Sequence, residues 1–311
     1  SDAEQHLLPI LSNEVFMTET YPLIVRENSE KTYSFDFENN NERNQGVTLN
    51  ICANPVWYAI QSLPYLSQEN GQYADVAFNI FYANSIASYI AQSIPNFLNY
   101  IEEWKVKSPD ALMSALQKDE NLKAIMLQET PWVLEAKSEA EQKAMLANLL
   151  DVNTIKDKTS ETLNLIKEKQ SVNGGWSWIE GMPENAFITR YILNGFGRLQ
   201  MMNVINSLEK NHQSIVNAIT EKAIGFIAEE VVEQYNFIKE KNKGKYYYSS
   251  STASNLFALS YFDFNYDKEF ITARNYFIKK LKDDWKKLSF SDQAKIALIL
   301  HRNGVTDTPQ L

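Results

Sequence analysis

The spacing of apolar residues along the chain changes near residue 74. Before that point apolar and polar residues alternate in short runs, most regularly in residues 31–37. Alternation with a period of two is typical of a strand that buries one face. Three further runs are rich in apolar, β-branched or aromatic residues: residues 14–17, 21–26 and 47–51. The sequence therefore predicts a short β segment over residues 1–53, with an Asn-rich polar connection at 38–46.

After residue 74 the spacing becomes helical. In residues 75–90 apolar side chains recur at steps of three and four, the period of an amphipathic helix. The same pattern predicts further helices at residues 96–105, 109–117, 119–128, 138–149, 153–169, 185–205, 211–238, 252–263, 267–285 and 289–302. Long helices joined by short links predict stacked antiparallel helix pairs, and therefore a mainly α fold.

Composition and charge exclude several classes of protein. Of the 311 residues 44% are hydrophobic and 12% aromatic, which is enough to bury a large core. The net charge of −9 gives no basic surface for nucleic acid, and the lysine-rich run at 239–245 is expected to be a solvated loop. No apolar run is long enough to predict a membrane span. Because Ser1 is not an initiator methionine, we expect a processed product or an excised segment.

Few residues in the chain are typical of metal or redox sites. A single cysteine, Cys52, rules out an internal disulfide framework and is expected to be a strand thiol. The histidines His6, His212 and His301 are far apart in sequence and show no metal-ligand spacing. We therefore predict no metal and no cofactor. His301 is expected to be a surface group at a helix end.

Residues 71–79, with the sequence Gly-Gln-Tyr-Ala-Asp-Val-Ala-Phe-Asn, follow an aromatic and proline-containing stretch at 54–66. This frame resembles the entry to the thioester domain of bacterial α2-macroglobulins, secreted relatives of complement proteins and protease traps. In that family the segment carries Cys-x-Glu-Gln. Its first, third and last positions fall here on Tyr73, Asp75 and Val76.

The resemblance implies a thioester site that has lost its chemistry. A thioester forms when a cysteine sulfur is acylated by the side-chain carbonyl of a glutamine three residues later. The phenol of Tyr73 and the isopropyl group of Val76 provide neither group, whereas Asp75 keeps an acid at its position. The sequence therefore predicts that this site forms no covalent bond.

Further segments are similar to the same family in the same order. Residues 170–178 resemble a Gln-x-x-x-Gly-Gly-aromatic-x-Trp turn shared by thioester domains, terpenoid cyclases and prenyltransferases, on the residues Gln170, Gly174, Gly175, Trp176 and Trp178. The paired glycines permit a tight turn with positive φ, and the two indoles are expected to pin it against neighbouring helices. Weaker matches lie at 129–133, which contains Thr-Pro-Trp, and at 254–262 and 296–304.

The resemblance implies an α/α toroid of antiparallel helix hairpins at residues 54–311, without its last helices. Residues 1–53 would belong to a sheet domain that the thioester domain interrupts. The implied function is a non-catalytic domain of a bacterial α2-macroglobulin-like protein, outside the cytoplasm in the periplasm or at the cell envelope. Its implied partners are other domains of the parent chain and proteases, which it would obstruct as part of an endopeptidase inhibitor without covalent tethering.

Two alternatives stay open. An α/α-toroid carbohydrate-active enzyme or lyase would need two carboxylates facing each other across a cleft. The acids Glu229, Glu230 and Glu233 are spaced to share one helix side, and Asp283-Asp284 is expected to be a solvated helix face. A scaffold or adhesion module would instead bind a partner through aromatic residues. Its candidate recognition surface is Tyr246, Tyr247 and Tyr248, which could equally pack as a loop before a capped helix.

Overall fold

The computed structural model describes residues 21–25, 29–35, 49, 56–67, 73–93, 99, 103, 145–150, 152–240 and 245–305. The chain divides into two compact units. The first comprises Ser1–Trp57 and Glu103–Met145, and the second comprises Tyr58–Glu102 and Leu146–Leu311. Residues 103–145 thus group with the N-terminal segment, which the sequence did not indicate.

In the first unit, the described residues 21–25 and 29–35 form no strand. They contact each other through side chains: the hydroxyl of Tyr33 donates to the carbonyl of Ile24 at 2.9 Å, and the rings of Tyr21 and Phe35 lie 5.2 Å apart. A sheet requires a ladder of backbone hydrogen bonds between strands, and these contacts do not provide one. The strands predicted at 21–26 and 31–37 are therefore not confirmed. The other predicted strands, apart from Leu49, and Cys52 lie outside the described residues.

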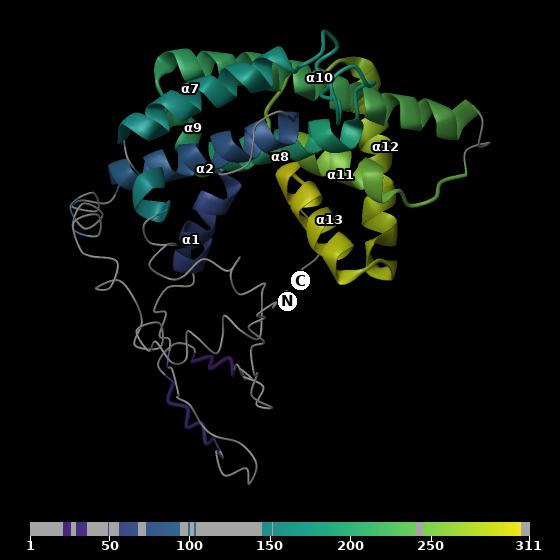
Figure 1. Cartoon of the computed structure of the whole chain (residues 1–311). Coiled ribbons are helices and arrows are strands. Elements are labelled where there is room, and N and C mark those ends of the chain that lie inside the picture. Colours follow the sequence, from purple (N-terminus) through teal and green to yellow (C-terminus); the bar gives the residue numbers. More distant parts are fainter. Residues whose placement is uncertain are drawn as a thin grey trace, which may run out of the picture. The chain divides into compact units, whose positions relative to one another are not determined.

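The second unit is helical (Figure 1). The described helices are α1 (Val56–Leu66), α2 (Ala74–Ser93), α7 (Val152–Glu168), α8 (Ala186–Met201), α9 (Val204–Ser207), α10 (Lys210–Glu240), α11 (Ser250–Leu259), α12 (Lys268–Asp284), the 3-10 helix η2 (Trp285–Lys287) and α13 (Phe290–Arg302). The predicted mainly α fold is confirmed for these residues. None of the helices among them is both long and apolar enough to cross a membrane.

The described helices differ from the sequence-based prediction at three places. Helix α11, predicted at 252–263, spans Ser250–Leu259. The helix predicted at 185–205 breaks after Met201, because Asn203 takes a left-handed conformation with a φ of 63° and the short helix α9 follows. Helix α1 was not predicted. It contains Pro64, a residue that usually ends a helix, within its last turn. The helices predicted at 109–117 and 119–128, the helix predicted at 96–105 apart from residues 99 and 103, most of 138–149 and the Thr-Pro-Trp stretch lie outside the described residues.

Side-chain caps begin four of the helices. In each case a side-chain oxygen of the residue before the helix accepts from backbone N–H groups of the first turn, which have no partner within the helix. The capping residues are Asn185 before α8, Ser249 before α11, Asp267 before α12 and Ser289 before α13. These caps explain why the predicted starts of these helices are close to the observed ones.

The helices of the second unit form two rows that alternate along the chain (Figure 1). In one row α2 contacts α8, α8 contacts α11, and α11 contacts α13. In the other row α7 contacts α10, and α10 contacts α12. From α7 onward each long helix is followed by one in the opposite row, and among successive long helices α8 packs on α10, α10 on α11 and α12 on α13.

Aromatic and aliphatic side chains form the core of the second unit. Trp176, Phe81, Phe196, Phe270 and Phe277 are the largest fully buried side chains of the described residues. The rings of Phe81 and Phe196 lie 5.8 Å apart and join α2 to α8. This core fixes the helix starts and loops on which the candidate site residues lie.

Candidate functional site

The three degenerate thioester positions lie together at the start of α2. Tyr73 immediately precedes the helix, is 46% exposed, and accepts the first helical hydrogen bond from Ala77 through its carbonyl at 2.9 Å. Asp75 lies in the first turn, where its carboxylate suits the positive end of the helix dipole. Val76 is half-buried. None of these side chains carries a sulfur or a carboxamide, so no thioester can form between them.

The Gly-Gly turn between α7 and α8 is fastened to α10. The side-chain amide of Gln170 donates to the carbonyl of Gly174 at 2.9 Å and to the carbonyl of Ile219 at 2.8 Å. Gly174 has a φ of 94°, and a Cβ atom at this position would lie 2.2 Å from the carbonyl oxygen of Lys222. The predicted tight turn with positive φ is therefore confirmed, and the close approach to α10 gives a second reason for glycine.

The two tryptophans of this turn have different environments. Trp176 is fully buried, and its indole N–H donates to the carbonyl of Ile166 at 2.8 Å. Trp178 is 48% exposed and stacks on Phe187 with 5.7 Å between ring centroids. Trp176 therefore anchors the turn in the core, whereas Trp178 packs on the first turn of α8 at the surface.

Glu184 completes the turn from its C-terminal side. Hydrogen bonds from the side chains of Ser171 and Asn173 hold the pKa of Glu184 below its ordinary value, with the bond from Ser171 as the larger cause. A Cβ atom on Gly175 would lie 2.7 Å from the Cβ atom of Glu184. This close approach favours glycine at the second position as well. The turn is a rigid structural element with no reactive group at its centre.

Tyr246, Tyr247 and Tyr248 do not form one exposed aromatic surface. The ring of Tyr246 packs edge-on against Tyr276 at 6.2 Å, and burial raises the pKa of Tyr246 to about 12. Tyr248 is half-buried, and burial likewise raises its pKa. Tyr247 alone of the three is exposed, at 69%. The following Ser249 caps α11 by accepting from the N–H of Thr252 at 3.2 Å, which agrees with the packed-loop interpretation.

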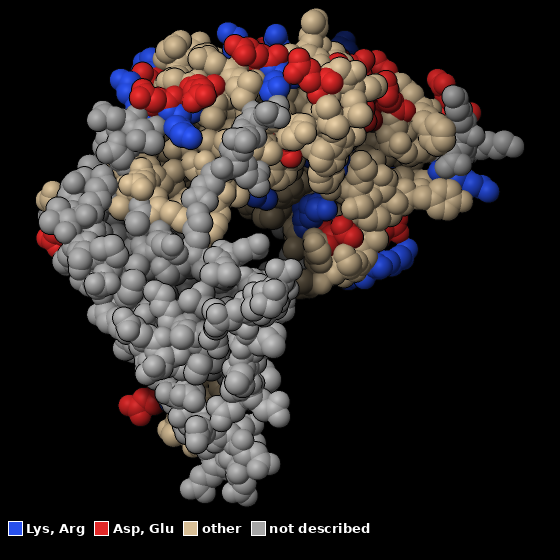
Figure 2. Space-filling view, viewed as in Figure 1, with Lys and Arg blue, Asp and Glu red and all other residues tan. Residues whose placement is uncertain are grey.

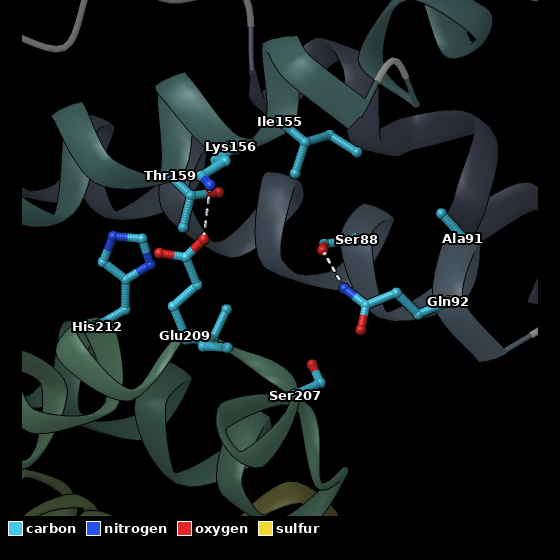
Figure 3. Close-up of a pocket in the computed structure, with 10 residues that line it drawn as sticks. Ser88, Ala91, Gln92, Ile155, Lys156, Thr159, Ser207, Glu209 and His212 are labelled. Atoms are coloured by element: carbon cyan, nitrogen blue, oxygen red, sulfur yellow. Dashed lines mark hydrogen bonds and ion pairs between the residues drawn. The ribbon is translucent and has the colours of Figure 1, made fainter.

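A pocket of about 220 Å³ lies between α2, α7 and the junction of α9 with α10 (Figure 3). Its polar lining comes from Ser88 and Gln92 on α2, Lys156 and Thr159 on α7, and Ser207, Glu209 and His212 at the junction. Sequence reasoning missed this pocket. Its residues belong to four helices, α2, α7, α9 and α10, and to the link between the last two, and none of them stands in a recognisable motif. His212 is one of three histidines without metal-ligand spacing.

Polar contacts organise the pocket. The ammonium group of Lys156 lies 2.9 Å from the carboxylate of Glu209, and this hydrogen bond lowers the pKa of Glu209 and raises the pKa of Lys156. The buried His212 has its Nε2 atom 2.9 Å from the hydroxyl of Ser160. Gln92 donates from its side-chain amide to the hydroxyl of Ser88 at 2.9 Å.

These contacts define what the pocket can do chemically. The Ser160–His212 distance would suit a nucleophile and its base, but Glu209 is paired with Lys156 and not hydrogen-bonded to the histidine in the described contacts. Glu209 is also the sole carboxylate among the described lining residues, so the pocket holds no facing pair of acids. Nor does the described part of the chain bring together three His, Cys, Asp or Glu side chains that could hold a metal ion.

The remaining acids named from the sequence lie away from this pocket. Glu229, Glu230 and Glu233 share α10, and the pKa of Glu230 is raised by burial and, to a smaller extent, by Glu233. Asp283 and Asp284 lie in the last turn of α12, where Asp284 accepts from Lys287 at 2.8 Å. His301 is an exposed group in the last turn of α13, as expected, and His6 lies outside the described residues.

Comparisons with models of known protein families, with curated proteins and with solved structures found no match.

Proposed function

We propose that the chain contains a non-catalytic domain of the thioester-domain type, from an α2-macroglobulin-like protein that acts without covalent tethering. The observation that carries this proposal is the start of α2. The positions that would hold the reactive pair share one helical turn with the required spacing, yet they are occupied by Tyr73 and Val76. This spacing on one turn, with residues that cannot react, supports the proposal of a thioester-type site without its chemistry.

The arrangement of the helices supports an α/α toroid. In a toroid of helix hairpins, inner and outer helices alternate along the chain. Each helix therefore contacts, within its own row, the helix two places further along the chain. The rows α2–α8–α11–α13 and α7–α10–α12 follow this order. The turn built by Gln170 and Trp176 is consistent with the same architecture, because its hydrogen bonds reach Ile166 on α7, Thr189 on α8 and Ile219 on α10.

The proposed role follows from what the domain retains. Residues 54–311 contain no cysteine that could form a covalent link to a target. In this proposal the helical scaffold therefore acts through non-covalent contact, with other domains of the parent chain or with a protease. In this proposal the domain is extracytoplasmic, in the periplasm or at the cell envelope, and contributes to endopeptidase inhibition by obstruction. The charges on its described surface are mixed, with acidic and basic side chains interspersed (Figure 2).

The test restores the missing pair. In the double variant Tyr73→Cys with Val76→Gln, a thioester-type scaffold should allow acylation of the new thiol, with loss of ammonia and a mass decrease of about 17 Da. Methylamine should then open the bond, add its mass and release one thiol. The single variant Tyr73→Cys is the matched control and should stay unmodified.

The unaltered chain provides the complementary measurement. It should show no mass change with methylamine and form no adduct with a protease that survives denaturation. Because the proposed obstruction needs the other domains of the parent chain, the chain alone should leave the activity of that protease unchanged. A methylamine-dependent mass shift of the unaltered chain would contradict the absence of thioester chemistry. A folded double variant that never loses ammonia would contradict the thioester-type scaffold.

A further inference from the structure

We propose that the pocket between α2, α7 and α10 binds a neutral, polyhydroxylated solute the size of one sugar ring. The site does not depend on the function proposed above, because no pocket residue belongs to residues 71–79 or to the turn at 170–178. The two proposals can therefore fail separately. Four features of the pocket lead to this ligand class.

The charges of the pocket favour a neutral ligand. Lys156 and Glu209 form an ion pair at 2.9 Å, and the side chains of both are more than half exposed, so they stand at the mouth of the pocket. An anion would compete with Glu209 for the ammonium group, and a cation would compete with Lys156 for the carboxylate. A neutral ligand leaves the pair intact and can still accept from Lys156 and donate to Glu209.

A buried hydroxyl in the wall has unused hydrogen-bonding capacity. Thr159 is 4% exposed, and its Oγ1 atom has no hydrogen-bond partner among the described residues. Buried polar atoms in folded proteins are nearly always paired with protein, water or ligand. Figure 3 shows the side chains of Thr159, Glu209 and His212 turned toward one another across the space between α7 and α10.

The remaining polar groups offer both donors and acceptors. His212 is 7% exposed and bonds Ser160 through Nε2, which leaves Nδ1 as its second polar atom. Gln92 uses its amide nitrogen for Ser88, and in the described contacts its amide oxygen has no partner. A ring of hydroxyl groups, each of which both donates and accepts, matches this mixed lining better than a ligand with one polar end.

The size and the apolar wall limit the ligand further. The pocket volume of about 220 Å³ is below the roughly 300 Å³ at which pockets for drug-sized ligands begin. Ala91, Ile155 and Leu208 supply apolar surface next to the polar groups. The C–H face of a pyranose or cyclitol ring would contact that surface while its hydroxyls reach the polar groups.

The experiment titrates the whole chain with single sugars and follows the imidazole resonances of His212 by NMR, assigned by their loss in His212→Gln. The neutral probes are glucose, N-acetylglucosamine and myo-inositol, and the charged probes are glucosamine and glucuronate. At least one neutral probe should shift the His212 resonances saturably in the millimolar range, and the charged probes should bind more weakly. The proposal is overturned if no neutral probe shifts these resonances, or if a charged probe binds best.

Two variants locate the binding. Glu209→Gln removes the charged acceptor and should lower the affinity for the neutral probe by about tenfold, the usual effect of losing a hydrogen bond to a charged group. Thr159→Val keeps the side-chain shape and should lower the affinity for the neutral probe by a few-fold, without loss of thermal stability. Glu221→Gln, an exposed acid on α10 away from the pocket, is the control and should bind as the unaltered chain does. Unchanged affinity in both pocket variants would place the sugar elsewhere and refute the site.

Discussion

The side-chain amide of Gln170 donates to the carbonyl of Ile219 at 2.8 Å, and so joins the end of α7 to the middle of α10. The same nitrogen also donates to Gly174 within the turn. One side chain thus satisfies two backbone carbonyls that belong to elements far apart in sequence. It holds the turn between α7 and α8 against α10.

Replacing Gln170 by Met should destabilise the fold. The substitution keeps the length of the side chain but removes both hydrogen bonds, so we expect a loss of about 1–3 kcal/mol in the free energy of unfolding. Urea unfolding followed by circular dichroism measures this change. Gln200→Met, at an exposed position of α8, is the control and should change stability little. Equal effects of the two substitutions would show that the bond to Ile219 contributes nothing.

Replacing Gly174 by Ala should be more damaging. The residue has a left-handed φ, which costs an L-residue about 1–2 kcal/mol, and the new methyl group would clash with the carbonyl of Lys222. We expect a loss of more than about 2 kcal/mol, or failure to fold. Gly225→Ala is the contrasting variant. That glycine lies within α10 with open space around it, so alanine there should stabilise the chain by about 1 kcal/mol. Thermal unfolding of both variants distinguishes the two effects.

The two tryptophans of the turn should differ in their contribution to stability. Trp176→Phe removes the hydrogen bond to Ile166 and leaves a cavity in the core, which should cost roughly 2 kcal/mol or more. Trp178→Phe keeps the stacking on Phe187 at the surface and should cost less than about 1 kcal/mol. Chemical denaturation of both variants checks the order. A reversed order would contradict the assignment of Trp176 as the anchor.

The raised pKa of Glu230 predicts a pH dependence of stability. Because the folded state holds this proton more tightly than the unfolded state, the stabilisation is complete below the ordinary glutamate pKa. It is lost as the pH rises through the raised value. Glu230→Gln should abolish this loss, so the variant should gain stability relative to the unaltered chain at neutral pH and not in acid. Urea unfolding across this pH range measures the difference, with Glu221→Gln on the same helix as the control. A gain of the same size at every pH would rule out titration of Glu230 as the cause.

The helical part of the fold was largely predictable from the sequence. Amphipathic spacing located α2, α7, α10, α12 and α13, because each of these helices buries one side against the opposite row. Spacing failed where a single residue overrides it. Asn203 breaks the helix predicted at 185–205 by its left-handed conformation. Helix α1 was not predicted because it contains Pro64, a residue that usually ends a helix.

The candidate site was predictable only in part. The positions Tyr73, Asp75 and Val76 are adjacent in sequence, so one helical turn brings them together, and their residue types already exclude a thioester. The positive φ at Gly174 was also predictable, because two adjacent glycines in a short link favour a tight turn. The pocket with His212 could not be found in this way. Its walls come from α2, α7 and the junction of α9 with α10, and nothing in the local sequence of any one of these elements indicates the others.

By itself the sequence determined the helical character of the described residues between 74 and 302, the tight turn at Gly174 and the loss of thioester chemistry at Tyr73 and Val76. These are local properties, set by side-chain spacing and chemical type over a few residues. Tertiary structure alone decided which helices share a row, that Gln170 reaches Ile219, that Tyr246 and Tyr248 turn inward, and that Thr159 and His212 line one pocket. Those outcomes depend on contacts between residues distant in sequence, which form only when the apolar faces of the helices are buried together.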